Sequence, residues 1–227
     1  MADESTVLLE EILGRLELLE AYLPRRIEAG GVFRRAKLPF HAVQCREVLA
    51  WRFAELAREA YEAIGRDRLA AAVLLTRAVM ETAAAQWYLR SRVTKALDSG
   101  DLGNIKSCVH RLLLGSRTSE DLPDPINVLS FVDAVNDTVE GFRDQFDHLC
   151  EVAHPNWAGT SQLYSQPDAQ ARAVEFGHNL RGSEGIRSRT VANLSVAMAM
   201  FELDYNEIAD LMDPFIELCE RDLDKTV

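Results

Sequence analysis

The chain has 227 residues, of which 48% are apolar, and a formal net charge of −11 at pH 7. This apolar content is sufficient for a sizeable core, so we expect a globular protein. The negative charge argues against a protein whose whole surface binds nucleic acid, because phosphate backbones require a positive field. The four cysteines lie far apart without a CxxC pair, which favours reduced thiols over a disulfide framework.

The N-terminus is acidic where a secretory signal would be basic. No apolar run approaches the roughly 20 residues that are needed to cross a bilayer. We therefore expect no membrane association and a cytoplasmic location.

Apolar residues recur at three- and four-residue spacing along most of the chain, which predicts helices. The first half is expected to hold helices over residues 6–23, 41–64 and 67–97. Between the first two lies a connector bounded by prolines, and it concentrates cations at Arg25, Arg26, Arg34, Arg35 and Lys37.

In the second half the pattern predicts a short helix over residues 104–114 and a helical segment over 126–152. The latter should break between Asn136 and Gly141, and Pro155 should end it. A final helix over 189–221 should kink or restart at Pro214. No strand-forming run is evident, so the fold class is all-α.

We expect one domain over residues 1–227, built as a bundle of about six or seven helices with one long irregular loop. Residues 1–40 would form an N-terminal helix and the basic connector, 41–154 the central bundle, 155–188 the loop, and 189–227 the C-terminal helix. A loop this long inside a compact domain is usually functional or mobile.

Arg77 and Glu81 lie one turn apart in an otherwise apolar stripe of the predicted central helix. Separating the members of a buried ion pair costs roughly 3–5 kcal/mol, so each should compensate the other. One interpretation is a structural pair that joins helices. The alternative is that the pair lines a cleft and orients a catalytic or ligand-binding group.

The stretch RDQFDHLCEVAHPNW, residues 143–157, combines an arginine, two histidines and a cysteine at a helix end. Its Arg143-x4-His148 spacing, with Arg77-x3-Glu81 and the later His154-Pro155-Asn156, resembles HEPN-like all-α bacterial proteins over roughly residues 49–159. The resemblance implies metal-independent RNA cleavage by a toxin or defence protein. A histidine would assist attack by the ribose 2′-hydroxyl, an arginine would stabilise the developing charge, and a homodimer would assemble the site.

Helix geometry divides this stretch into separate faces. Five positions on a continuous helix place Arg143 and His148 ~140° apart, so they cannot easily share one phosphate within one chain. Asp147 is the natural partner of Arg143 at i,i+4. His154 at the helix end is therefore the more plausible catalytic histidine, with Arg77 and Glu81 as its expected companions.

The spacing His148-x-Cys150-x3-His154 also suggests a metal site, because imidazole and thiolate suit zinc. His148 points away from the other two, however, and no fourth ligand is evident. A buried cysteine that behaves as a small hydrophobe is the favoured interpretation. We therefore expect no metal and no cofactor.

Asn156 and Trp157 have two interpretations. In the first, Asn156 closes a turn and Trp157 packs against the bundle. In the second, which does not exclude the first, His154 and Asn156 lie at the mouth of a pocket whose floor holds Arg77 and Glu81. In the connector, Arg34, Arg35 and Lys37 could contact a phosphate backbone.

Two hypotheses for function follow. The first is a HEPN-like ribonuclease with RNA as its partner and His154, His148, Arg143, Arg77 and Glu81 as candidate catalytic residues. The second is a non-catalytic helical module that binds a protein partner or a small ligand, with an Arg-Glu-His network that is structural.

Overall fold

The structure is a computed structural model that describes residues 4–30 and 35–225. Within these residues it confirms the all-α bundle and contains nine helices and one two-stranded hairpin. In chain order the elements are α1 (Glu4–Tyr22), α2 (Leu38–Gly65), α3 (Leu69–Ser99), α4 (Ile105–Leu114), α5 (Val128–Asn136), α6 (Phe142–Ala153), α7 (Ser161–Tyr164), β1 (Ser165–Asp168), β2 (Ala173–Phe176), α8 (Ser183–Asp210) and α9 (Met212–Lys225).

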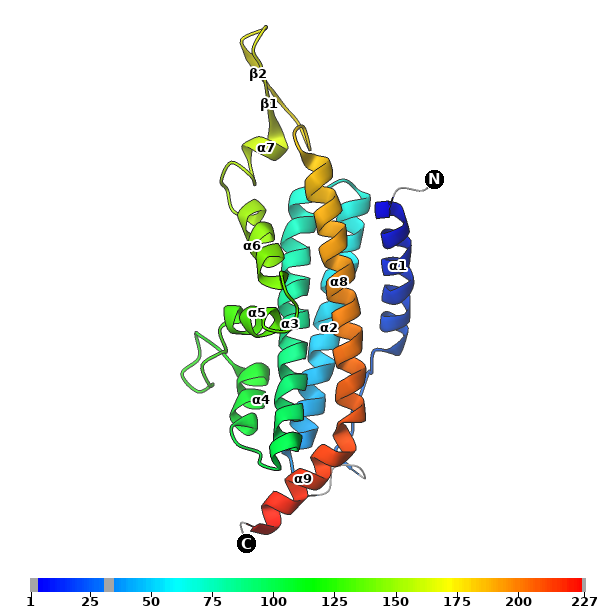
Figure 1. Cartoon of the computed structure of the whole chain (residues 1–227), viewed down its shortest axis with the longest axis vertical. Helices are drawn as coiled ribbons and strands as arrows, with labels where there is room; N and C mark the ends of the chain where they lie inside the picture. The colour runs from blue at the N-terminus through cyan, green and yellow to red at the C-terminus, as the bar shows by residue number, and fades with distance from the viewer. Residues whose placement is uncertain (1–3, 31–34, 226–227) are drawn as a thin grey trace.

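Three long helices, α2, α3 and α8, run side by side along the molecule (Figure 1). α1 covers the outer side of α2 and α8, while α4, α5 and α6 each pack against α3. α9 lies at the lower end of the bundle in Figure 1, and the hairpin projects beyond the upper end. No helix among residues 4–30 and 35–225 is both long and apolar enough to span a membrane.

α3 is the central helix because small side chains let its neighbours approach closely. Ala72, Ala83 and Ala84 are fully buried, and α2 and α8 pack along this helix. The core between α2 and α8 is filled by Phe53 and Phe201, whose rings stack with centroids 4.0 Å apart. Such aromatic pairs add stability beyond the area that they bury.

The predicted break in the 126–152 segment is confirmed, since the segment forms two helices, α5 and α6. Local chemistry explains where these helices begin and end. The Asn127 side chain accepts a hydrogen bond from the Leu129 N–H and caps α5. Gly141 precedes α6 with φ 83°, a conformation that favours glycine. α6 ends at Ala153 because Pro155 forces the residue before it, His154, into an extended conformation.

The helix count exceeds the expected six or seven for local reasons. α7 is a single turn of four residues. The C-terminal segment divides at Leu211, with Pro214 in the first turn of α9, where a missing N–H is tolerated. α8 also begins at Ser183, six positions before the expected start at Arg189.

The expectation of no strands is wrong for residues 165–176, which lie in the predicted irregular loop. β1 pairs antiparallel with β2, with Ser165 opposite Phe176 and Asp168 opposite Ala173. The Asp168 carboxylate accepts hydrogen bonds from two backbone N–H groups in the turn. β1 has the sequence SQPD, which has no apolar alternation and contains a proline, so neither propensity nor periodicity marks it as a strand.

Candidate functional site

Arg77 and Glu81 face α6 from the N-terminal half of α3. The Arg77 Nη2 atom lies 3.2 Å from the Glu81 Oε1 atom, and the guanidinium carbon lies 5.5 Å from the ring centre of Phe146. Their side chains are 33% and 20% exposed, so the pair lies at the edge of the α3–α6 junction rather than deep in the core. The ion pair lies within α3 and holds the guanidinium in place, while the cation–π contact with Phe146 links α3 to α6.

Cys150 lies beside this pair, one turn after Phe146 on α6. Burial raises the pKa of the Cys150 thiol, while the positive charge of Arg77 acts in the opposite direction. In the part of the chain that the structure describes, no three histidine, cysteine, aspartate or glutamate side chains are grouped to hold a metal ion. Cys150 is a neutral, half-buried thiol, in keeping with its role as a small hydrophobe.

Arg143 is held between two carboxylates. Its Nε donates to Asp147 Oδ2 over 2.8 Å, which is the i,i+4 partner predicted above. Its Nη1 donates to Asp133 Oδ1 on α5 in a short hydrogen bond. The Arg143 backbone N–H also donates to Asn136 Oδ1 at 3.0 Å. Arg143 thus ties the start of α6 to α5, and its positive charge is locally neutralised.

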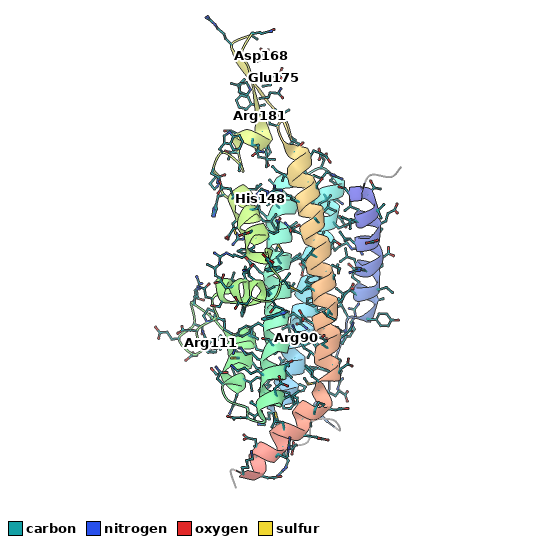
Figure 2. All side chains as sticks on the ribbon, viewed as in Figure 1. Arg90, Arg111, His148, Asp168, Glu175 and Arg181 are labelled. Atoms are coloured by element: carbon teal, nitrogen blue, oxygen red, sulfur yellow. The ribbon has the colours of Figure 1, made fainter. Side chains whose placement is uncertain are left out.

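His148 lies on a different face of α6 from Arg143, as the helix geometry requires, and is labelled on α6 in Figure 2. Burial and the nearby Arg189 lower the pKa of His148, while Glu151 acts in the opposite direction. The Nε2 atom is buried and has no hydrogen-bond partner among the described residues. His148 is therefore favoured in its neutral form and does not share a site with Arg143.

The end of α6 presents His154, Asn156 and Trp157. Asn156 Nδ2 donates to Glu151 Oε1 over 2.7 Å, and the Gly159 N–H donates to Asn156 Oδ1 over 3.1 Å, so Asn156 closes the turn. Trp157 is 62% exposed, and the interpretation that it packs against the bundle is wrong. Most of the Trp157 side chain is therefore in contact with solvent.

His154 is exposed, and its side chain forms no hydrogen bond or ion pair with any residue that the structure describes. Its ring is therefore not bonded to Arg77 or Glu81. The α6 residues that lie beside the ion pair are Phe146 and Cys150, which precede His154 by one turn or more. The expected three-residue constellation is therefore not assembled by hydrogen bonds.

The basic connector is partly neutralised by α9. Glu220 accepts hydrogen bonds from the backbone N–H groups of Arg35 and Ala36, at 2.7 and 2.8 Å, and from Arg35 Nε at 3.0 Å. These bonds, led by that from Ala36, lower the pKa of Glu220. Arg35 also pairs with Asp224 at 2.7 Å. Lys37 remains exposed at the start of α2, and Arg34 lies outside the described residues.

The sequence patterns missed a pair of histidines at the other end of the bundle. His41 on α2 and His110 on α4 lie with ring centroids 5.4 Å apart, near Lys37 and Lys106. Only the packing of α4 against α2 brings them together. No local spacing could have revealed this cluster, although each histidine lies close in sequence to a lysine.

Comparison of the chain with protein-family models, curated proteins and solved structures found no match. Function must therefore be inferred from the chemistry of the chain itself.

Proposed function

We propose that this protein is a non-catalytic helical bundle of the cytoplasm that acts by binding a protein partner or a small ligand. The observation that supports this most directly is that two carboxylates already compensate the charge of Arg143. Its guanidinium is bonded to both Asp133 and Asp147. An RNA phosphate that approached Arg143 would lie beside both carboxylates, whose negative charges already offset the guanidinium and would repel the phosphate.

The other candidate catalytic groups also fit a structural role. Arg77 is paired with Glu81 and lies over Phe146, so it contributes to the packing of α6 on α3. His148 is half-buried on a different face of α6 from Arg143, and burial lowers its pKa, so its neutral ring packs against the bundle apart from that guanidinium. On this proposal the Arg-Glu pair and Arg143 stabilise the arrangement of α3, α5 and α6.

A HEPN-like ribonuclease is the second candidate, and two observations favour it. His154 is exposed and unpaired, and the Nε atom of Arg77 is buried without a hydrogen-bond partner among the described residues. A ligand oxygen that reached Arg77 would satisfy that donor. If this candidate is correct, the protein cleaves RNA without a metal and acts as a homodimer, as the family resemblance implies.

Incubation with end-labelled RNA in the presence of a chelator separates the two candidates. We expect no cleavage by the parent protein, because the candidate catalytic arginines, Arg77 and Arg143, are engaged in ion pairs. We also expect Arg143→Ala to lower Tm, since the substitution leaves Asp133 and Asp147 facing each other.

Cleavage by the parent that is lost in His154→Ala or His148→Ala would overturn the binding proposal and support the ribonuclease. Cleavage that persists in both variants would instead indicate a contaminating nuclease. Circular dichroism of each variant shows whether the fold is retained.

A further inference from the structure

A cavity of about 590 Å³ opens between the start of α2, the start of α4 and the last turns of α9. These three segments meet at the lower end of the bundle in Figure 1, away from α6 and the hairpin. A second hollow of about 530 Å³ shares Gly103, Lys106 and His110 with it. Cavities of several hundred Å³ are the usual size for small-molecule sites.

Cationic and titratable side chains converge on this cavity from three segments. Lys37 lies just before α2, His41 is in its first turn, and Lys106 and His110 lie one turn apart on α4. Neither lysine is in an ion pair with any residue in the ranges 4–30 and 35–225. Since Arg35 is already bonded to two carboxylates, the two lysines carry the available positive charge.

Two helix N-termini add to this positive field. α2 begins at Leu38 and α4 at Ile105, and residues at the start of both helices line the cavity. Their N-cap residues, Lys37 and Asn104, make no side-chain capping hydrogen bond. Helix N-termini favour anions through their unpaired N–H groups and the helix dipole.

The walls also include apolar surface and one carboxylate. Leu38, Leu102 and Leu223 line the cavity, and Leu114 and Pro123 line the neighbouring hollow. Asp222 of α9 is the carboxylate in the wall. A site with apolar walls and a few convergent cations suits a ligand that has an anionic head and an apolar body.

We propose that this cavity binds a small organic phosphate monoester, with the phosphate between Lys37, Lys106 and the His41–His110 pair and the apolar body against the leucines. Lysines are effective phosphate ligands as point charges. The site lies at the opposite end of the bundle from His154, so it stands independently of whether the α3–α6 junction cleaves RNA.

Protonation should be coupled to this binding. Burial lowers the pKa of His41, and His110, Lys37 and Lys106 lower it further. The remaining neighbours are Asp222, the neutral Cys219 thiol, whose pKa burial raises to about 12, and Arg35 with its carboxylate partners. A bound anion counteracts the cations, so His41 gains a proton on binding and affinity rises as pH falls.

The test is calorimetric titration of the full chain with phenyl phosphate, inorganic phosphate and phenol. We expect phenyl phosphate to bind more tightly than phosphate, and phenol not to bind. Lys106→Gln and His110→Gln should each weaken phenyl phosphate binding about tenfold, the usual effect of losing one charged hydrogen bond. Lys95→Gln, on the exposed side of α3, is the matched control and should leave the affinity unchanged.

The proposal is overturned if phenyl phosphate gives no binding up to roughly 10 mM, or if both variants bind as tightly as the parent. Equal affinity for phosphate and phenyl phosphate would show that the apolar walls contribute nothing to binding, and would overturn that part of the proposal. Sulfate remains a dianion between about pH 5.5 and pH 8, so its titration reports only the protein groups. Sulfate affinity that fails to rise at the lower pH, or rises equally in His41→Gln, would contradict the coupling to His41.

Discussion

Asp204 on α8 is a buried carboxylate that faces Arg90 on α3, a residue labelled in Figure 2. Arg90 Nε donates to Asp204 Oδ1 over 2.6 Å, while Oδ2 is buried without a hydrogen-bond partner among the residues described. Burial raises the pKa of Asp204 to about 6, although the hydrogen bond and charge of Arg90 oppose the shift. Ionised Asp204 is therefore only partly compensated in the folded protein.

This raised pKa predicts how stability depends on pH. Because the folded-state pKa of Asp204 exceeds the ordinary value of 3.8, the folded state binds more protons than the unfolded state between the two values. The contribution of Asp204 to stability therefore falls as pH rises. Relative to Asp204→Asn, the parent should gain about 1 kcal/mol of unfolding free energy when pH is lowered from about 7 to about 5.

Urea unfolding of both proteins at both pH values measures this difference. The asparagine variant cannot titrate at this position, so it subtracts the effects of all other groups. A stability difference that does not change with pH would contradict the raised pKa.

Contacts within one helix could be predicted at the residue scale, and contacts between helices could not. The pairs Arg77–Glu81 and Arg143–Asp147 follow from i,i+4 spacing and are present. The second partner of Arg143, Asp133, lies on another helix and depends on how the α5–α6 turn folds back. No spacing rule in a single sequence specifies that turn.

Among the elements, α1 is attached to the bundle by one narrow apolar face. Ile12 and Leu16 are 1% and 0% exposed and belong to the main core, while Leu18 on the opposite side is 62% exposed. α1 packs on α2 and α8, and the Arg58–Glu20 ion pair adds a contact at its edge. Most of the free energy that holds α1 on the bundle must therefore come from burial of this apolar face.

We expect Leu16→Ala to lower the unfolding free energy by about 2–5 kcal/mol, because it removes buried methyl groups and leaves a cavity. Leu18→Ala, on the same helix and with the same change of side chain, should alter it by less than about 0.5 kcal/mol. Denaturant unfolding of the two variants gives the comparison. Equal effects would show that α1 does not dock through Leu16.

Element positions were predictable to within a few residues wherever an apolar period ran for several turns, as in α2, α3 and α4. The break before Gly141 and the stop before Pro155 were also predictable, because backbone chemistry determines both. The hairpin was not, since its strands have four residues each and β2 is exposed along its length. Short solvated strands have no burial pattern from which to infer them.

For the molecule as a whole, the bundle should not depend on the hairpin for its stability. The strands pair with each other, and β2 is fully exposed, with Phe176 82% exposed. The base of the hairpin is tied to the bundle, because Asn179 Nδ2 donates to the Asp67 carbonyl over 2.8 Å and Arg68 Nη1 lies 3.0 Å from His178 Nε2.

Replacement of residues 167–174 by a short Gly-Ser loop should therefore change Tm by no more than about 2 °C, since exposed surface carries little stability. Thermal unfolding followed by circular dichroism measures this, with Leu16→Ala as the destabilised reference. A loss as large as that of the reference would show that the hairpin supports the bundle.

α3 also limits communication between the two ends of the protein. Its 31 residues extend about 46 Å. Arg77 and Glu81 lie in its N-terminal half, whereas Leu102 and Gly103, which line the proposed phosphate cavity, follow its last residue. Direct charge–charge coupling is screened over about 10 Å, far less than this length. A ligand in the cavity and a chemical change near His154 should therefore change the unfolding free energy by amounts that add. Only a shift of α3 as a rigid unit would couple the two.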